Sequence, residues 1–423
     1  MPSSDPATVH IVGAGLAGLA AAVRLVGTGR TIIVHEATNQ AGGRCRSYID
    51  QTTGMLIDNG THLVLSGNHA ALAFAKQVGG ESGLTGPASA EFAFVDLAND
   101  ARWTLRISDG VFPWWVFDKK RRVPETHATD YFSLARLLWT SGDKPISSVM
   151  NCDSPLYQRL VAPLLLAALN IEPLSGSAKL AGALVRETLA MGGKACRPLM
   201  AREGIGKVFV EPAVDYLRGH GVPISFEHAL NGMRFAGTRV SHLDFADAAL
   251  ALGDDDIVIL AVPAHAAGTF VPGLQAPSSY RGIVNVQFRC DPPDGSPGMI
   301  GLINGTSEWI FTFPHRIAVT ISDASRLFDK PRPELAQQIW REVATVLKLS
   351  DALPPWQIVR ERRATFAATP EENAKRPGPE TKWGNLILAG DWTATGLPAT
   401  IEGAIRSGNR AADLVKTSRR AAA

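Results

Sequence analysis

Short runs in which nearly every residue is apolar recur near the start, in the middle and near the end of the chain. They have the length of strands and cover residues 9–12, 31–35, 256–262 and 385–389. Continuous apolar runs of this length are typical of parallel strands that are buried on both faces. Stretches with helical periodicity occur at 208–218 and from about residue 400. The pattern predicts an α/β, Rossmann-like domain assembled from separate parts of the chain.

A different pattern fills the intervening segments, which are partly helical and partly rich in β-forming residues. Their clearest elements are predicted at 156–169, 180–191, 283–289, 309–313 and 334–347. A chain of 423 residues is too long for one core. We therefore predict a first domain interleaved with an α+β second domain, with a ligand cavity between them. The first domain comprises 1–68, 203–265 and 380–423, and the second comprises 69–202 and 266–379.

The first apolar run leads into Gly13-Ala14-Gly15-Leu16-Ala17-Gly18, a G-x-G-x-x-G segment that opens a helix. Gly13 makes the tight turn from strand to helix, Gly15 lets the backbone approach a pyrophosphate, and Gly18 lets the helix lie close to the sheet. The free N–H groups at the helix N-terminus then face the phosphates. The segment predicts a dinucleotide site.

Glu36 follows the second apolar run at the spacing of the acidic residue that holds a ribose hydroxyl, and Ala37 lies beside it. A carboxylate here argues against NADP, because it would repel the 2′-phosphate. Strand, helix, second strand and acid together make the motif far more specific than the glycines alone. The choice between NAD and FAD depends on the segments that follow.

The next two motifs resemble the amine oxidase and phytoene desaturase superfamily of flavoproteins. Gly42-Gly43-Arg44 resembles its G-G-R segment, in which the glycines pass the pyrophosphate and the arginine lies near the phosphates or the flavin. The run Asp58-Asn59-Gly60-Thr61-His62 resembles its D-x-G-x-H segment, which runs near the flavin. The resemblance implies FAD as the cofactor and adds Gly60, Thr61 and His62 to its expected surroundings.

The C-terminal part extends the resemblance. Gly390-Asp391 resembles the second FAD motif of these flavoproteins, whose aspartate hydrogen-bonds the ribityl chain. A helix beginning near Thr400 would point its N-terminus at the N1–C2=O edge of the flavin and stabilise negative charge there. The residues expected beside this edge are Pro398, Ala399, Thr400 and Ile401.

The middle segment carries a third group of expected cofactor contacts. The run 256–263 resembles a strand of the superfamily that ends near Val262, and its apolar pattern is in any case that of a buried strand. Lys207 and Val208 stand where the preceding amphipathic helix begins. We expect Lys207, Val208 and Val262 to lie against the cofactor.

Composition removes several other classes of protein. The net charge of +2 gives no nucleic-acid signal, and the ten histidines and four cysteines show no spacing typical of a metal site or a disulfide framework. The sequence has no apolar run of about 18 residues, and the residues before the first strand are mostly polar, so we expect neither a transmembrane helix nor a signal peptide. These features predict a cytoplasmic protein without a metal.

Four stretches narrow the resemblance to the bacterial squalene-associated flavoproteins, the hydroxysqualene dehydroxylases. They are residues 163–170, 209–213, 360–370 and 389–408. The last stretch is the most specific, because amine oxidases and ordinary carotenoid desaturases diverge within it. The likeness thins over 81–150 and 290–350, and the sequence departs from the family at Ile171-Glu172 and around 111–122. These departures concern the cavity rather than the cofactor.

The resemblance implies reductive dehydroxylation of hydroxysqualene to squalene, with hydride delivered from N5 of reduced FAD to an allylic carbon. The protein would position a C30 hydrocarbon and exclude water. Residues 156–169 are candidates for an apolar tunnel wall, although plain core packing explains them as well. His62, Thr395 and Glu402 are candidates for the proton donor, because their motifs are expected near the flavin.

Two other functions fit the same motifs. One is a phytoene-desaturase-like enzyme that oxidises or isomerises a polyprenoid or carotenoid precursor. The other is a non-enzymatic carrier of prenyl lipids, as in the Rab-escort and GDP-dissociation-inhibitor proteins, although the intact glycine motifs weigh against it. Amine oxidation fits less well, because no aromatic cage is identifiable.

The sequence contains no second G-x-G-x-x-G that could bind a nicotinamide cofactor permanently. The electron donor for the flavin is therefore either external or an NAD(P)H that docks transiently.

Residues 111–122 suggest a separate property. They place Trp114, Trp115 and other aromatic residues beside the four cationic residues 119–122. Aromatic and basic residues together suit the interface of an anionic bilayer, where the substrate would also partition. A β-hairpin with core aromatics and solvated charges explains the same run. Peripheral contact with a membrane near Trp114–Arg122 is therefore one of two interpretations.

Overall fold

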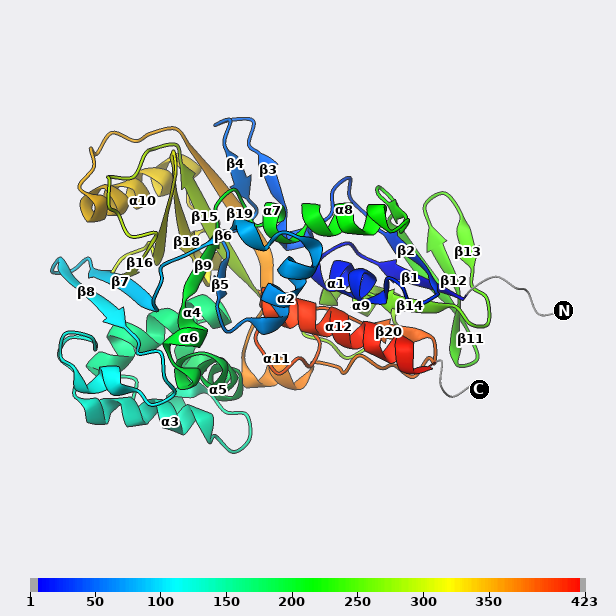
Figure 1. Ribbon diagram of the computed structural model, residues 1–423, viewed down its shortest axis with the longest axis horizontal. Helices are drawn as coiled ribbons and strands as arrows, with labels where there is room; N and C mark the ends of the chain where they lie inside the picture. Colours follow the sequence, from blue (N-terminus) through cyan, green and yellow to red (C-terminus); the bar gives the residue numbers. More distant parts are fainter. Residues whose placement is uncertain (1–6, 419–423) are drawn as a thin grey trace.

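The computed structural model describes residues 7–418 as an elongated molecule with two parts along its long axis (Figure 1). One part is built on a five-stranded parallel sheet in the order β10-β2-β1-β14-β20. Its strands are β1 (Thr8–Val12), β2 (Thr31–His35), β10 (Ile224–Ser225), β14 (Ile257–Leu260) and β20 (Leu386–Leu388). The predicted α/β fold with a parallel sheet is confirmed, and the strands come from distant parts of the chain.

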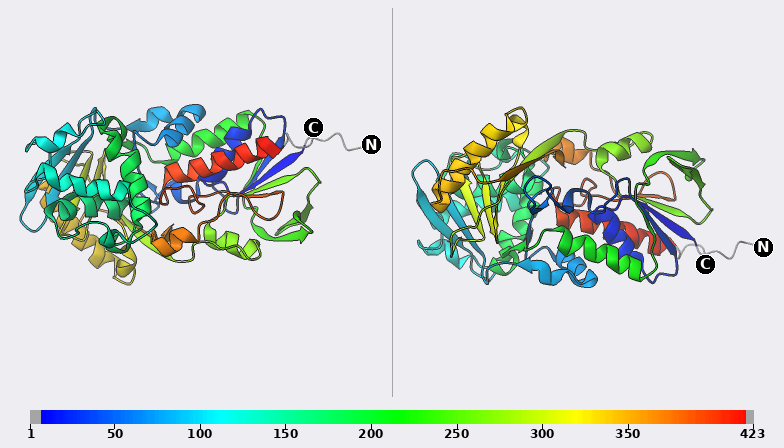
Figure 2. Two further views of the ribbon diagram at one scale, coloured as in Figure 1. Left: turned by 90° about the horizontal axis from the view of Figure 1, so that it is seen from below. Right: turned by 90° about the horizontal axis from the view of Figure 1, so that it is seen from above.

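Alternate residues of β14 point into two different layers. Ile257 and Ile259 pack with one layer, the helices α1 (Leu16–Leu25), α8 (Glu211–Gly219) and α12 (Ile401–Ser418), which lie together on one face of the sheet (Figure 2). Val258 and Leu260 pack with the other layer, the small sheet of β11 (Leu230–Ala236), β12 (Arg239–Phe245) and β13 (Ala249–Ala251). Because both faces are covered, the strand is apolar at every position.

The other part is built on a seven-stranded sheet in the order β19-β15-β18-β17-β16-β7-β8, in which only β16 and β7 pair in parallel. The strands are β7 (Glu91–Asp96), β8 (Ala101–Arg106), β15 (Tyr280–Phe288), β16 (Met299–Ile303), β17 (Trp309–Phe313), β18 (Arg316–Ile321) and β19 (Trp356–Phe366). Helix α10 (Arg332–Leu347) covers one face, where it packs against Val284 and Val286. The other face contributes to the cavity described below.

A helical layer lies beside this second sheet (Figure 1). It consists of α3 (Phe132–Leu138), a π-helical turn at Tyr157–Val161, α4 (Ala162–Leu169) and α5 (Ala178–Glu187), close to the helices predicted at 156–169 and 180–191. The prediction for 69–202 named no strand and was incomplete, because β7 and β8 lie there. The shorter elements are β3 (Ser47–Ile49), β4 (Leu56–Asp58), β5 (Leu63–Leu65), β6 (Leu84–Thr85), β9 (Pro198–Ala201), α2 (His69–Val78), α6 (Gly193–Cys196), α7 (Gly206–Phe209), α9 (Ala264–Phe270) and α11 (Pro370–Ala374).

One local expectation needs correction. Residues 114–117 form a 3₁₀ turn rather than a hairpin, and Trp115 is only 3% exposed because it packs edge to face on Tyr131, with ring centroids 5.0 Å apart. At the C-terminus, α12 continues through residues 416–418. Residues 419–423 lie outside the described part of the chain, as do residues 1–6, which bear on the expectation of no signal peptide.

Candidate active site

One cavity of about 1040 Å³ lies between the two parts of the molecule, and its wall combines two kinds of surface. Polar backbone of the first part supplies one kind, and most of the residues expected around FAD belong to it. They are Gly13, Gly15, Leu16, Ala17, Glu36, Ala37, Gly42, Gly43, Arg44, Gly60, Thr61, His62, Val262, Gly390, Asp391, Ala399, Thr400 and Ile401. Apolar side chains of the second part supply the other kind, among them Leu134, Leu160, Leu164, Leu184 and Phe311.

The glycines of the first motif differ in whether a side chain would fit at their positions. Gly13 has a φ of 105°, and a Cβ there would lie 2.5 Å from the carbonyl oxygen of Ala261. A Cβ at Gly18 would lie 1.9 Å from the carbonyl oxygen of Gly13, so the helix could not approach its own strand. At Gly15, in contrast, a Cβ would meet no atom within 4 Å, and the residue lines the cavity. The space kept open at Gly15 fits a phosphate-bearing ligand.

Glu36, just after β2, is 8% exposed, and its carboxylate is hydrogen-bonded to the glycine turn. Its Oε2 accepts the N–H of Ala14 at 2.8 Å, and its Oε1 accepts the N–H of Thr38 at 3.0 Å. The carboxylate still borders the cavity, where a ribose would meet it.

His35 and His228, which were not predicted from the sequence, line the same region of the cavity, with their Nδ1 atoms 3.0 Å apart. Burial, followed by the neighbouring His10 and His228, lowers the pKa of His35 to about 3, so it is neutral at physiological pH.

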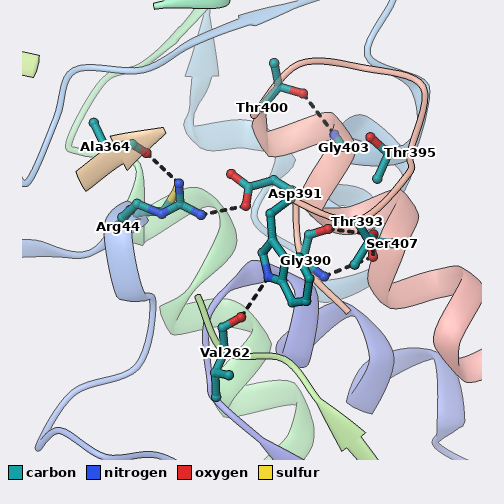
Figure 3. A network of polar contacts seen from close by, with 12 residues as sticks. Arg44, Val262, Ala364, Gly390, Asp391, Thr393, Thr395, Thr400, Gly403 and Ser407 are labelled. Carbon is teal, nitrogen blue, oxygen red and sulfur yellow. Dashed lines mark hydrogen bonds and ion pairs between the residues drawn. The ribbon is translucent and has the colours of Figure 1, made fainter. Parts of the chain in front are cut away.

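Arg44 and Asp391 join the two FAD motifs across the cavity (Figure 3). One guanidinium nitrogen of Arg44 donates to Oδ1 of Asp391 at 2.8 Å, and the other donates to the carbonyl oxygen of Ala364 in β19 at 2.5 Å. The carboxylate of Asp391 raises the pKa of Arg44, so the guanidinium stays charged. Asp391 is 6% exposed, which makes the pairing important, because a lone buried carboxylate is strongly destabilising. With FAD bound, the second carboxylate oxygen would be available to a ribityl hydroxyl.

Arg376, which the sequence analysis did not identify, holds the loop that contains Asp391. It is 7% exposed and donates to the carbonyl oxygens of Asp391, Trp392, Thr393 and Leu397 and to the hydroxyl of Thr395. Burial lowers the pKa of Arg376 to about 10, which still leaves it charged at neutral pH. One side chain therefore satisfies most of the acceptors of this loop.

The three candidate proton donors occupy different surroundings. His62 lines the cavity, with Nε2 3.4 Å from the carbonyl oxygen of Arg44 and 3.8 Å from the sulfur of Cys45. Glu402 also borders the cavity, but it is 2% exposed and its carboxylate accepts the N–H groups of Ala70 and Ala71 at the start of α2 and pairs with Arg406. Thr395 is not among the lining residues, and its hydroxyl accepts from Arg376. Of the three, the geometry favours His62.

Five of the residues expected at the cofactor do not line the cavity. Ala14 and Gly18 act through the glycine turn itself, as described above, and Pro398 is buried just before α12. Val208 is 1% exposed in the core of the first part. Lys207 does not line the cavity, and its side chain pairs with Glu211 one helical turn later at 2.6 Å. The structure thus brings most of the predicted set together and separates Lys207 and Val208 from it.

Within residues 7–418, no helix is long and apolar enough to cross a membrane. The same residues contain no group of three or more histidine, cysteine or acidic side chains that could hold a metal ion. The backbone cradle at Gly15, the acid at Glu36 and the Arg44–Asp391 pair instead fit a dinucleotide that carries a flavin ring. The fold and the site together define a flavoprotein oxidoreductase.

Comparisons with known proteins agree with this class. A family described as flavin containing amine oxidoreductase matches residues 16–416. The chain is 58% identical over 415 residues to a hydroxysqualene dehydroxylase of Rhodopseudomonas palustris, covering 98% of this chain and 99% of that protein. It is 55% identical over 409 residues to another of Sinorhizobium fredii, covering 97% and 98%. The solved cyclohexylamine oxidase of Brevibacterium oxydans shares the fold, with a TM-score of 0.71 at 16% identity, covering 98% of this chain and all of that one.

The chain therefore belongs to the hydroxysqualene dehydroxylase family, within the flavin-containing amine oxidoreductases. It is an FAD-dependent enzyme, as its motifs predicted.

Proposed function

We propose that this enzyme reduces hydroxysqualene to squalene. One observation carries the proposal: a single cavity joins the FAD motifs to a long wall of aliphatic and aromatic side chains. Such a wall suits a C30 isoprenoid, which buries apolar surface along its whole length. The names of the relatives with 58% and 55% identity support the same substrate.

The reaction needs a hydride, a proton and a dry site. Reduced FAD, when bound, supplies the hydride to the allylic carbon. The carbon–oxygen bond breaks, the hydroxyl takes up one proton and leaves as water, and a carbon–hydrogen bond replaces it. The apolar wall excludes other water, which would otherwise recapture the allylic cation. A reductant must restore the flavin after each turnover, and because the sequence contains no second dinucleotide fingerprint, this reductant is either an external donor or an NAD(P)H that docks transiently.

We assign the proton to His62. Burial alone would lower the pKa of His62, but the sulfur of Cys45, the carboxylate of Asp58 and the carbonyl of Arg44 outweigh burial and raise it to about 9. The ring is therefore protonated at neutral pH, as a general acid must be. Its Nε2 is held between Arg44 and Cys45, so the ring stays at the wall of the cavity.

The direct test is anaerobic turnover of hydroxysqualene by the holoenzyme reduced with dithionite, read by gas chromatography. Squalene should form in an amount equal to the flavin oxidised. A yellow protein that forms no squalene would contradict the proposal. Reduction of the oxidised flavin by a polyene precursor would then favour the desaturase, and a colourless protein would favour the prenyl-lipid carrier.

The pH dependence tests the role of His62. The single-turnover rate should fall as the pH rises through about 9, because the imidazolium then loses its proton. Cys45→Ala removes a contact that raises this pKa, so the fall should move to lower pH. His62→Asn should lower the rate about 100-fold and remove the fall. The exposed residue His220 provides the control His220→Asn, and an unchanged profile in His62→Asn would exclude this assignment.

We further propose that the enzyme docks on an anionic bilayer through the surface of Phe112, Trp114 and Phe117. These side chains are 52%, 66% and 59% exposed, and their rings lie within 6.3 Å of one another, centroid to centroid. The exposed Lys119 and Lys120 follow them and supply charge complementary to the lipid headgroups. Trp115 is part of the core and not of this surface.

Helix α3 connects this surface to the cavity. The 3₁₀ turn that precedes α3 packs on the turn at 114–117, and Phe132 at the start of α3 is 74% exposed. Leu134, less than one helical turn later, lines the cavity. A substrate dissolved in the bilayer would therefore have a short path into the apolar part of the cavity.

Vesicle binding tests this surface. Replacing Phe112, Trp114 and Phe117 with serine should weaken co-sedimentation with phosphatidylglycerol–phosphatidylcholine vesicles about tenfold or more, because the aromatic area is lost. Wild-type binding should also weaken with salt, because Lys119 and Lys120 contribute. Ile49→Ser removes an equally exposed apolar residue from β3 and should change nothing. Unchanged binding of the triple variant would exclude this surface.

A further inference from the structure

Asn285 is a buried polar residue on the part of the cavity wall that the seven-stranded sheet forms. It lies in β15 and is 1% exposed, and its neighbours on the wall from this sheet include Ile283, Met299 and Phe311. A buried amide in such a place is destabilising unless its hydrogen-bonding groups are paired.

Only one half of the Asn285 amide has partners. Its Oδ1 accepts the N–H of Thr61 at 3.1 Å and the hydroxyl of Thr320 at 2.8 Å. Its Nδ2 is buried and has no hydrogen-bond partner among the described residues. Because a backbone N–H can only donate, Thr61 fixes which end of the amide carries the oxygen. Nδ2 of Asn285 is therefore an unpaired N–H donor, and the two hydrogen bonds to Oδ1 hold the amide group in place.

The sheet register shows where this donor lies. Asn285 is opposite Thr320, and Thr320 is opposite Trp309, so the three side chains form one row on one face. All three line the cavity, and the indole N–H of Trp309 is also buried without a partner in the described chain. Nδ2 of Asn285 would lie 3.3 Å from a Cβ placed on Gly60, two residues before His62. The row thus brings an unused donor to the segment expected beside the flavin.

We propose that Nδ2 of Asn285 donates a hydrogen bond to the hydroxyl oxygen of the substrate, so that the cavity selects an allylic alcohol over the hydrocarbon made from it. This inference rests on the proposed function and names the group by which its substrate is recognised. The alcohol supplies the acceptor that the buried donor lacks. The hydrocarbon leaves the donor unpaired, and sites built to bond a polar group discriminate strongly against ligands that lack it. The same residue therefore favours substrate binding and product release.

Binding of hydroxysqualene and squalene to the oxidised holoenzyme tests the assignment. In Asn285→Leu, the ratio of the two affinities should fall about tenfold or more, because only the alcohol loses a bond. A purely structural role would weaken both ligands together and leave the ratio unchanged. A changed flavin spectrum or FAD affinity with an unchanged ratio would mean that the donor binds the flavin. Either of these results would overturn the proposal.

A second variant avoids the loss of the two acceptor contacts. Asn285→Asp keeps an oxygen for Thr61 and Thr320 but replaces the donor. Its selectivity for the alcohol should be lost when the carboxyl is ionised and return at lower pH, when the protonated carboxyl can donate. Thr312→Val in β17 replaces a polar residue of the same sheet that does not line the cavity, and should leave the ratio unaltered.

The two proposals can fail separately. A wild-type enzyme that prefers hydroxysqualene in binding, but does not convert it, would refute the dehydroxylation and keep the role of Asn285. A wild-type enzyme that forms squalene, with an affinity ratio that Asn285→Leu leaves unchanged, would refute the role of Asn285 alone.

Discussion

Replacing Arg376 with methionine should release FAD and destabilise the first part of the molecule. The substitution keeps much of the side-chain volume but removes the donors for four backbone carbonyls and one hydroxyl between Asp391 and Leu397. Each buried polar group left unpaired costs about 1–3 kcal/mol. Some of the carbonyls will reach water, so we expect a loss of stability on the order of 4 kcal/mol. Asp391 belongs to the same loop, so its alignment with Arg44 should be lost as well.

The measurement for Arg376→Met is the ratio of flavin to protein absorbance after purification, together with the urea midpoint. Arg24→Met is a matched control, because Arg24 forms a surface ion pair with Asp413 that is 42% and 48% exposed at its two side chains. Such a pair contributes about 0–1 kcal/mol, so the control should keep its FAD. Full flavin content and a normal midpoint in Arg376→Met would show that other contacts hold the loop.

The sequence predicted the local parts of the site better than the parts made by tertiary contacts. The turn at Gly13 to Gly18 was predicted from the spacing of its glycines, and Gly18 is constrained by the carbonyl oxygen of Gly13 within the same strand–helix unit. Arg376, in contrast, belongs to no sequence motif with a recognisable spacing. It lies 15 residues before Asp391 in a charged, irregular stretch, and arginine is usually exposed. Its role depends on how the loop returns to it in space.

Asn285 and Trp115 show two further limits. Asn285 becomes informative only when the register of β15, β18 and β17 is known, because its partners come from two other segments. Trp114 and Trp115 are neighbours with opposite exposure, and the axial rotation of a short 3₁₀ turn cannot be read from composition. Strand β8 could have been predicted, because residues 101–106 alternate between apolar and polar positions, and residues 91–96 of β7 are a short apolar run between two acidic residues.

Replacing Gly408 with alanine should separate the two helices whose N-termini border the cavity. A Cβ on Gly408 in α12 would lie 2.1 Å from the carbonyl oxygen of Ala17 and 3.1 Å from Cβ of Ala20, both in α1. The first of these atoms is backbone, so the helices must move apart. Alanine favours a helix over glycine by about 1 kcal/mol, but overpacking costs about 1–3 kcal/mol, so we expect a net loss of stability.

In Gly408→Ala, FAD binding should be affected more strongly than the stability of the protein. Gly15 and Leu16 at the start of α1, and Ile401 at the start of α12, all line the cavity, so a shift between the helices changes both sides of the FAD site at once. We expect FAD affinity to fall about tenfold or more, measured by flavin fluorescence on titration of the apoenzyme. Gly268→Ala in α9 is the matched control. A Cβ there meets no atom within 4 Å, so the same substitution should stabilise the protein slightly and leave FAD affinity unchanged. If both variants behave alike, helix propensity rather than the α1–α12 contact governs position 408.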